Sequence, residues 1–354
     1  MTVRIAAVGY GDIAQRRHFP QLAELAGRAE LVAIAGRDEA RMAACASKFG
    51  VPRWSTDVAS VVGDPGVDAV LVLTAPDTHL RFAEMAVAAG KHVLVEKPLV
   101  PTLDEAVRLA AAVRARPVTF MALPFIETPD HVLAAELIAR GAIGEVSAVE
   151  CHRGHKGPTH AGWFYDKAQA GGGVLADLGI YHLTSIATLF GGASRFTVSL
   201  STRFAERVLD DGTVVRPDVE DSALVSLVLE SGVAASMHAH WNGSQPHTAT
   251  RARVLVIGRE GSLYFGAPDG AVHLWRPDGA GFGGEAGVFD SLPVQSFRTA
   301  GGPAQIMRAF VERIERGDVS TRSLDVQAHV LEIIARSYEG GGQPIEPKTR
   351  VFFL

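Results

Sequence analysis

The sequence predicts an α/β protein of two domains. Residues 1–122 are expected to form a doubly wound parallel sheet, and residues 123–354 an α+β domain with an open, mostly antiparallel sheet. Three observations predict this. The length of 354 residues exceeds one compact core, short continuous apolar runs alternate with helical patterns in the first part, and several runs in the second part alternate apolar and polar residues between tight turns.

The apolar runs of the first part suit strands that are buried on both faces of a sheet. The five predicted strands are Val3–Val8, Leu31–Ala35, Ala69–Leu73, His92–Val95 and Val118–Ala122. Between them, Ala40–Phe49 and Phe82–Ala89 have helical patterns, and a glycine closes each. Thr102 to Glu105 form a capping box, which predicts a helix that ends near Pro117.

The second part changes to strands joined by turns such as Glu230-Ser231-Gly232. Its predicted strands are Glu145–His152, Phe196–Phe204, Ala223–Glu230, Val233–His240, Arg253–Ile257, Leu263–Phe265 and Val272–Trp275. Its predicted helices are His131–Arg140, Ile180–Leu189, Ala304–Arg316 and Leu324–Tyr338. Gly279–Gly287 is rich in glycine and is predicted to be a loop.

Composition excludes several classes of function. A net charge of -5 offers no basic stripe, which argues against a nucleic-acid or anionic-membrane partner. The two cysteines, Cys45 and Cys151, form no C-x-x-C pattern, so a reducing compartment is expected. The N-terminus has no signal-like segment, and no apolar stretch approaches the roughly 20 residues that span a bilayer. We therefore expect a cytoplasmic protein with no membrane partner.

A glycine turn follows the first predicted strand. In Gly9-Tyr10-Gly11-Asp12-Ile13-Ala14, Gly9 permits the bend, Gly11 allows close approach of a diphosphate, and Ala14 lets the next helix sit on the strand. Asp12 and Ile13 open that helix, whose N–H groups attract an anion. The alternative is an ordinary strand–helix turn, but the strand–helix series around it favours a dinucleotide site.

The end of the second strand bears on the choice of cofactor. It reads Ala35-Gly36-Arg37-Asp38, so a glycine stands where an acid would accept from a ribose 2′-hydroxyl. Arg37 follows, which favours NADP over NAD because arginine accommodates a 2′-phosphate. In the alternative interpretation, Arg37 is merely solvated and Asp38 caps the next helix.

Strings farther along the chain resemble the Gfo/Idh/MocA family, named for glucose–fructose oxidoreductase, inositol dehydrogenase and a rhizopine-catabolism protein. The most specific string is Ala89-Gly90-Lys91-His92-Val93-Leu94-Val95-Glu96-Lys97-Pro98. The others are Thr74-Ala75-Pro76-Asp77-Thr78-His79, Gly141-Ala142-Ile143-Gly144-Glu145-Val146 and Gly171-Gly172-Gly173-Val174-Leu175-Ala176-Asp177-Leu178-Gly179-Ile180-Tyr181. The resemblance covers essentially the whole chain and includes the dihydrodiol dehydrogenase branch.

The resemblance implies a Rossmann domain, a second domain with an open sheet, and an active site between them. It places Lys97 beside the nicotinamide and the reacting carbon. It also implies that the Lys97–Pro98 peptide bond is cis. A cationic lysine there can hold the substrate hydroxyl and pass a proton, with Glu96 orienting it. Thr74, Pro76, His79 and Glu96 are expected at the cofactor. In isolation, Glu96 and Lys97 would be interpreted as a solvated pair.

The second landmark predicts the other catalytic groups. Asp177 matches the acidic substrate ligand of the family, and many members carry histidine four residues later. Here Tyr181 holds that position, which resembles the glucose–fructose oxidoreductase and dihydrodiol dehydrogenase branches, and His182 follows it. We favour Tyr181 as proton donor because a spacing of four shares one helix face, whereas His182 is turned away. The alternative for His182 is a core or interface histidine.

A dense aromatic and basic segment precedes this landmark and predicts the wall of a sugar pocket, with His155, His160 and Trp163 as substrate contacts. A metal site made of His152, His155 and His160 is the less favoured alternative, because their spacing fits no helix face. No metal is therefore expected. His238 and His240 share one side of a strand, and by resemblance that open sheet packs against another subunit in a homodimer or homotetramer. His18 could approach the cofactor, although a helix-break role is favoured.

The leading hypothesis is an NADP-dependent dehydrogenase or reductase acting on a sugar, cyclic polyol or related hydroxy or keto carbon. A nicotinamide-dependent glycosidase or lyase on the same fold would turn over without a net change in nicotinamide absorbance. A non-catalytic, cofactor-sensing regulator would be inert under a broad sugar screen, and the presence of Lys97, Asp177 and Tyr181 argues against it.

Overall fold

The computed structural model describes residues 2–124, 128–243, 253–266, 271–279, 284–289, 292–298, 306–339 and 342–351. The chain divides into two compact units, Met1–Phe125 with Gln305–Leu331, and Ile126–Ala304 with Glu332–Leu354. A single division after residue 122 differs from this, because residues 305–331 return to the first unit. The cause is packing: Leu324 and Ala328 belong to the same buried cluster as the strands of the first sheet, and Arg28 pairs with Glu315 at 2.6 Å.

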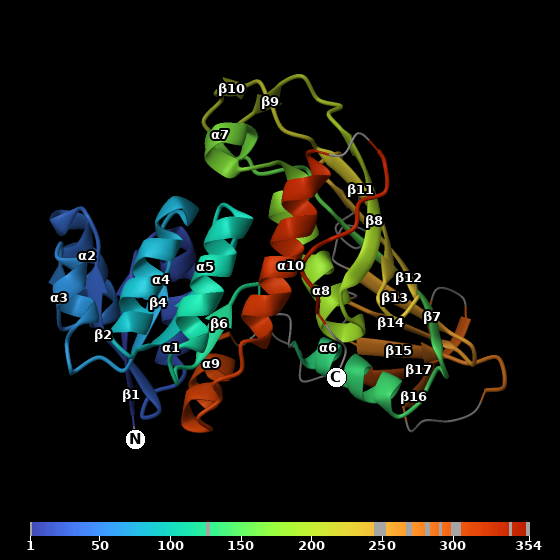
Figure 1. The fold of residues 1–354 in the computed structure, drawn as a ribbon, viewed down its shortest axis with the longest axis horizontal. Helices are drawn as coiled ribbons and strands as arrows, with labels where there is room; N and C mark the ends of the chain where they lie inside the picture. Colours follow the sequence, from blue (N-terminus) through green and yellow to red (C-terminus); the bar gives the residue numbers. More distant parts are fainter. Residues whose placement is uncertain are drawn as a thin grey trace. The chain divides into compact units, whose positions relative to one another are not determined.

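The first unit is built on a six-stranded sheet in the order β3-β2-β1-β4-β5-β6, in which every neighbouring pair is parallel (Figure 1). Its strands are β1 Val3–Val8, β2 Ala29–Ala35, β3 Trp54–Ser55, β4 Ala69–Val72, β5 His92–Val95 and β6 Phe120–Ala122. This is the strand order of a doubly wound dinucleotide-binding sheet, so the predicted fold of this part is confirmed. β4 is buried along its whole length, as its continuous apolar run predicts.

Helices connect these strands. The connecting elements are η1 Ala14–His18, α1 Phe19–Ala23, α2 Glu39–Phe49, α3 Val58–Val62, η2 Pro76–Thr78, α4 His79–Ala88 and α5 Leu103–Arg114. Near the end of the chain, α9 Ile306–Glu315 also belongs to this unit, as does α10 Arg322–Ser337 as far as Leu331. The predicted capping box is confirmed, since Thr102 Oγ1 accepts from Glu105 N at 3.3 Å and the Glu105 carboxylate accepts from Thr102 N at 3.1 Å. Gly50 ends α2 in the left-handed conformation, with φ +66. The short elements β3 and α3 were not predicted.

The second unit is built on a nine-stranded sheet in the order β16-β17-β15-β14-β13-β7-β12-β11-β8, parallel only between β7 and β12. Its strands are β7 Val146–Gly154, β8 Ala193–Ser201, β11 Ser222–Leu229, β12 Ala234–His240, β13 Arg253–Gly258, β14 Ser262–Phe265, β15 Ala271–Trp275, β16 Glu285–Phe289 and β17 Leu292–Arg298, and a separate hairpin pairs β9 Arg207–Val208 with β10 Val214–Val215. The mostly antiparallel sheet is therefore confirmed. The loop prediction for Gly279–Gly287 is wrong in part, because residues from Glu285 onward pair with β17.

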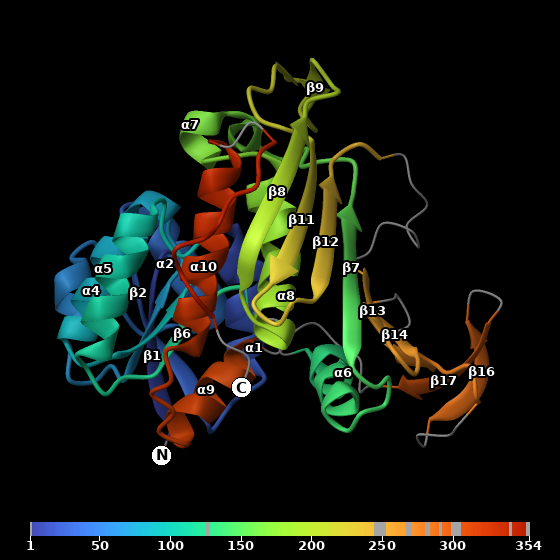
Figure 2. The same ribbon diagram turned by 45° about the vertical axis from the view of Figure 1, so that its right-hand side comes forward.

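One face of this sheet is covered by helices, including α8, as Figures 1 and 2 show. The helical elements of the unit are α6 Pro129–Ala139, η3 Gly162–Tyr165, α7 Lys167–Ala170, η4 Leu175–Gly179 and α8 Ile180–Phe190. Along β11 buried and exposed residues alternate, so the other face stays open, with Leu224 47% exposed. Residues Lys167–Phe190 are long and apolar enough to cross a membrane by composition, but 72% of the most apolar window is buried inside the structure, as in a core helix.

Candidate dinucleotide and substrate sites

The glycine turn after β1 requires glycine at its first position. Gly9 has φ +99, and a Cβ there would lie 2.5 Å from the carbonyl oxygen of Leu73 at the end of β4. A Cβ on Gly11 would meet nothing within 4 Å, so the backbone at this second glycine is open to a ligand. Ala14, the first residue of η1 Ala14–His18, is completely buried. The conformation and packing of the three small residues fit the motif, and their contact with a diphosphate stays a prediction.

The helix that follows begins with one α-turn, in which Gln15 N donates to Gly11 O at 3.1 Å, and then continues as a π-turn. Phe19 N donates to Ala14 O, a bond across five residues, and η1 spans Ala14–His18. Asp12 and Ile13 lie exposed before it, and the Asp12 carboxylate is 2.7 Å from Arg16 in an exposed ion pair. The unsatisfied N–H groups at this helix start can bind an anion. π-turns occur mostly as single turns, frequently at functional sites.

The end of β2 forms the next part of this site. A Cβ on Gly36 would lie 2.3 Å from the ring of Tyr10, so Tyr10 occupies the space that an acidic side chain would need. The Tyr10 hydroxyl donates to Asp38 O at 3.1 Å. Asp38 itself caps α2, its carboxylate accepting from Arg41 N at 3.0 Å. Arg37 lies exposed between Gly36 and Asp38.

Past β4, a buried histidine holds two loops together. His79 is completely buried; its Nε2 lies 3.0 Å from Thr74 O and its Nδ1 lies 2.9 Å from Pro98 O. The structure thus places His79 in the interior, where it links the turn after β4 to the segment after Lys97. Thr74 and Pro76 lie at the less buried part of this turn, and the Thr78 hydroxyl donates to the Thr74 hydroxyl at 2.7 Å.

Glu96 and Lys97 follow β5 directly. Glu96 is only 7% exposed; its Oε1 lies 2.8 Å from His18 Nε2, and its Oε2 accepts from Lys97 N at 2.7 Å. Burial raises the pKa of the Glu96 carboxyl, but the hydrogen bonds from His18 and from the backbone N–H of Lys97, together with the charge of Lys97, outweigh burial and lower it overall. Lys97 is half-buried, and the Lys97–Pro98 peptide bond is cis, as predicted.

These groups all lie where parallel strands end. The Gly9 turn follows β1, Gly36 follows β2, Thr74 follows β4 and Glu96 follows β5. In open parallel sheets, ligands bind outside the carboxyl ends of the strands, where the strand order reverses. Here the order reverses between β1 and β4, which places the glycine turn at that point.

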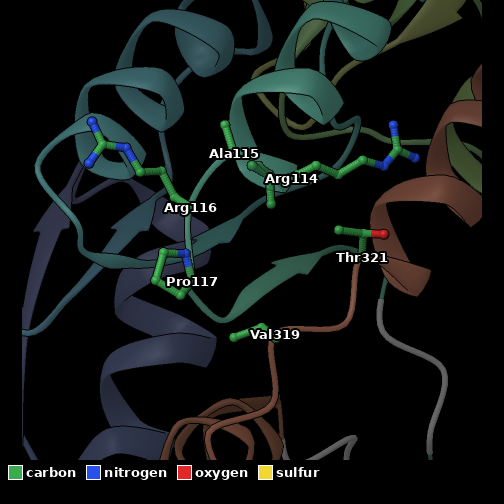
Figure 3. Close-up of a pocket in the computed structure, with 7 residues that line it drawn as sticks. Arg114, Ala115, Arg116, Pro117, Val319 and Thr321 are labelled. Carbon is green, nitrogen blue, oxygen red and sulfur yellow. The ribbon is translucent and has the colours of Figure 1, made fainter.

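A groove of about 410 Å³ lies elsewhere in the same unit (Figure 3). It is lined by Val113, Arg114, Ala115, Arg116, Pro117, Val319 and Thr321. Five of these seven residues lie at the end of α5 or between α5 and the start of β6, so the groove lies at the amino ends of the strands. It is therefore at the opposite edge of the sheet from the glycine turn and does not belong to the dinucleotide site.

In the second unit, a buried glutamate holds the glycine-rich turn Gly171–Gly173. The Glu220 carboxylate accepts from Gly173 N at 3.1 Å, from Leu175 N at 2.9 Å and from the Tyr338 hydroxyl at 3.0 Å. A Cβ on Gly173 would lie 2.0 Å from Glu220 O, so this position requires glycine. Burial raises the pKa of both Glu220 and Tyr338. Sequence reasoning missed Glu220 and Tyr338, which are distant along the chain and lie in no motif.

This turn leads into the segment that carries Asp177 and Tyr181. η4, Leu175–Gly179, is a second π-turn, in which Ile180 N donates to Leu175 O. Asp177 therefore lies in a wider turn than the regular α-helix in which residues four apart, such as Asp177 and Tyr181, share one face. Both side chains are half-buried, and the guanidinium of Arg153 lies 4.2 Å from the centroid of the Tyr181 ring.

His182 has a different environment from Tyr181. It is 2% exposed, and its Nε2 lies 3.0 Å from His152 O on β7. Burial, with a smaller contribution from the charge of Arg153, lowers the pKa of His182 to about 3. A buried, neutral histidine bonded to backbone packs α8 against the sheet.

The predicted pocket-wall residues lie in several environments. His155 Nδ1 accepts from Gly157 N at 2.9 Å; burial lowers the pKa of His155, while the charge of Asp177 acts in the opposite direction. His160 is exposed, with its ring centroid 5.4 Å from that of Phe164. Trp163 is 45% exposed and stacks on Phe164 at 3.8 Å. Only His155 of the three is thus placed in electrostatic reach of Asp177 by these contacts.

Three histidines meet on the open sheet face. His238 is paired with His152 across β12 and β7, and the Nε2 atoms of His152 and His240 are 3.1 Å apart. His155 and His160 do not join them as the alternative metal site required. Among the residues that the structure describes, no group of three histidine, cysteine, aspartate or glutamate side chains could hold a metal ion.

The first unit has the fold and the phosphate-binding turn of a dinucleotide-dependent oxidoreductase. Residues 3–123 match the oxidoreductase family with an NAD-binding Rossmann fold, and residues 131–264 match the GFO/IDH/MocA C-terminal domain. The chain belongs to this family, and the predicted resemblance is confirmed. It is an NAD(P)-dependent oxidoreductase. Lys97 lies in the first unit and Asp177 and Tyr181 in the second, so their meeting at one active site stays a prediction.

Two curated relatives indicate the range of the family. The 1,5-anhydro-D-fructose reductase of Ensifer adhaerens is 30% identical over 236 residues, which are 66% of this chain and 67% of that protein. The scyllo-inositol 2-dehydrogenase (NAD(+)) of Bacillus subtilis strain 168 is 29% identical over 266 residues, covering 75% of this chain and 74% of that protein.

Solved structures share the fold. Levoglucosan dehydrogenase in complex with NADH and L-sorbose matches with a TM-score of 0.85 and 21% identity, over 98% of this chain and 99% of that chain. A 3-ketoreductase from Actinomadura kijaniata in complex with TDP-benzene and NADP matches with a TM-score of 0.74 and 24% identity, over 96% and 98% of the two chains.

Proposed function

We propose that the chain is an NADP-dependent dehydrogenase or reductase that acts on a carbinol or carbonyl carbon of a sugar or cyclic polyol. The observation that carries this proposal is the position of Lys97 just after β5, in the same unit as the glycine turn that suits a diphosphate. The buried Glu96 carboxylate accepts a hydrogen bond from Lys97 N at 2.7 Å. The similarity to a 1,5-anhydro-D-fructose reductase and a scyllo-inositol 2-dehydrogenase supports this substrate class.

The roles of the side chains follow from their chemistry. When bound, the nicotinamide supplies or accepts the hydride. In the oxidising direction, the hydroxyl proton goes to Tyr181 in its phenolate form while the Lys97 ammonium donates to the substrate oxygen, or it goes to Lys97 in its neutral amine form. Asp177 accepts from a neighbouring hydroxyl and so fixes the sugar. Tyr181 is favoured over His182 because His182 is buried on the His152 backbone, whereas Tyr181 is half-buried.

The proposed preference for NADP rests on the end of β2. Gly36 has no side chain and the Asp38 carboxylate already accepts from Arg41 N, so neither is suited to a ribose 2′-hydroxyl. The exposed Arg37 can pair with a 2′-phosphate. Arg37→Ala should weaken binding of NADPH about tenfold and leave NADH nearly unchanged, as measured by fluorescence titration. An equal effect on both would remove Arg37 from this role.

A nicotinamide absorbance screen over sugars, inositols and their keto derivatives tests the activity. Lys97→Ala should abolish turnover of any substrate found and leave NADPH binding largely intact. Turnover without net absorbance change would favour the glycosidase or lyase alternative, and a protein that binds NADPH but turns over nothing would favour the regulator.

We also propose that copies associate as a homodimer or homotetramer through the open face of the second sheet. Exposed Leu224 and the half-buried His152 and His238 on this face support the proposal. Light scattering of the native chain and of Leu224→Lys tests it, since a charge on that face should dissociate the assembly. An unchanged mass for the variant would argue against this face.

A further inference from the structure

A buried histidine extends the site beyond Glu96 and Lys97. His18 is completely buried at the end of the first π-turn, and its Nε2 lies 2.8 Å from Glu96 Oε1. The second oxygen of the same carboxylate accepts from Lys97 N at 2.7 Å. A continuous chain of hydrogen bonds therefore joins the helix after the glycine turn to Lys97, all within the first unit.

The surroundings of His18 indicate its protonation state. Its Nδ1 is buried and has no hydrogen-bond partner in the described part of the chain. An imidazolium would leave a buried N–H donor unpaired there, whereas a neutral ring with its hydrogen on Nε2 leaves only a lone pair. The geometry thus favours a neutral His18 that donates to an ionised Glu96, so the pair carries one negative charge beside Lys97.

We propose that His18 is a positioning residue for Lys97, acting through Glu96. By donating from Nε2, it fixes the orientation of the carboxylate and keeps it ionised. The carboxylate in turn holds the Lys97 backbone, and its charge, which interacts with that of Lys97, favours the cationic amine. The inference rests on the proposed function for the role of Lys97 in turnover, but the hydrogen-bond chain itself does not.

The π-turn is what brings His18 to Glu96. Its wider hydrogen-bonded ring adds one residue between the glycine turn and the end of η1. The same helix start supplies the N–H groups for a diphosphate, so one rigid segment serves both the cofactor and the lysine. If His18 had only a structural role, filling this space would be sufficient and its hydrogen bond to Glu96 would not affect Lys97.

The test measures the reactivity of the Lys97 amine directly, without any substrate. Full-length wild-type chain, His18→Leu and Glu96→Gln are treated with trace acetic anhydride over a range of pH, and acetylation is quantified by mass spectrometry. Lys167 of the second unit is the internal reference. Both variants should raise acetylation of Lys97 near neutral pH about tenfold, as expected when the amine loses a cation-stabilising charge worth about one pKa unit.

Controls separate positioning from packing. His92→Leu makes the same change at the other end of β5, where Nδ1 accepts from Thr119 N at 2.9 Å, and should leave Lys97 unchanged. His18→Gln, whose amide can donate as Nε2 does, should restore wild-type reactivity. The double variant of His18 and Glu96 should shift Lys97 no further than either single one.

The outcomes distinguish this inference from the proposed function. Unchanged Lys97 reactivity in Glu96→Gln, or in a folded His18→Leu, overturns the positioning role, even if Lys97→Ala abolishes turnover. If His18→Leu does not fold, Glu96→Gln and His18→Gln decide the question. Shifted reactivity in a chain that turns over no sugar upholds the hydrogen-bond chain while the proposed activity fails.

Discussion

Replacing Gly173 by alanine should damage the second unit at one defined point. The new Cβ would lie 2.0 Å from Glu220 O and 2.9 Å from Glu220 N, and contacts under 3.0 Å essentially never occur, so the turn must move by about 1 Å. That movement breaks the bonds of the Glu220 carboxylate to Gly173 N and Leu175 N. Each is worth from about 1 kcal/mol for a neutral acceptor to about 3 kcal/mol for a charged one, so the expected loss is about 2–6 kcal/mol.

Gly171→Ala is the matched control. Gly171 has φ +75 but open space around its Cβ position, so alanine there should cost only the left-handed penalty of about 1–2 kcal/mol. Urea unfolding followed by circular dichroism compares the two variants through their midpoints and slopes. Gly173→Ala should also lose turnover because Asp177 follows on the displaced turn. Equal midpoints, or a Gly173→Ala chain that keeps full activity, would refute this reasoning.

Three further changes probe other elements. Thr102→Ala removes the cap of α5 and should lower the free energy of unfolding by about 1 kcal/mol in the same urea assay, whereas an unchanged midpoint would show that the cap contributes nothing. The pKa of His182, lowered to about 3 mainly by burial, leaves this residue unprotonated in the fold at pH values where the unfolded chain binds a proton. The contribution of His182 to the free energy of unfolding is complete above about pH 6.5, is reduced by about 2 kcal/mol at about pH 5, and declines further toward pH 3. His182→Gln should make the free energy of unfolding less dependent on pH over this range, and an equally steep pH dependence in the variant would contradict this prediction. Tyr338→Phe removes one bond to Glu220 and should lower stability by about 1 kcal/mol and reduce kcat, and full stability in urea would show that this hydroxyl contributes nothing.

The first sheet was predictable because its signals are local. A strand that is buried on both faces, such as β4, needs a continuous apolar run, and the glycine turn after β1 is a motif of consecutive residues. Only the structure shows that the backbone of Leu73, distant in sequence, is what requires glycine at Gly9. The elements that were missed give little signal. β3 and the hairpin strand β9 are two residues long, and β16 begins in a glycine-rich segment that pairs only because β17 lies beside it.

The candidate site was predictable where a motif carries it, as at Gly9, Glu96 and Lys97. Glu220 and Tyr338 were not predictable, because the groups that they contact are far away in the sequence. Glu220 is 47 residues from Gly173, and Tyr338 is 118 residues from Glu220. A buried glutamate without a motif is indistinguishable in a sequence from a solvated one. Only the fold shows that its carboxylate accepts three hydrogen bonds.

A π-turn lies at each of the two candidate sites, where the sequence pattern predicts only a regular helix. Each follows a glycine-rich turn and widens the helix by one residue, so positions counted with the α-helical repeat are displaced from there on. Each is also held by a buried glutamate from elsewhere in its own unit: Glu96 meets His18 at the end of the first, and Glu220 accepts from Leu175 at the start of the second. π-turns are rare in helices, and here both have tertiary hydrogen bonds that the α-helical register would not preserve. The buried carboxylates therefore determine where His18 and Asp177 lie, and a sequence pattern that describes only the helix cannot contain that information.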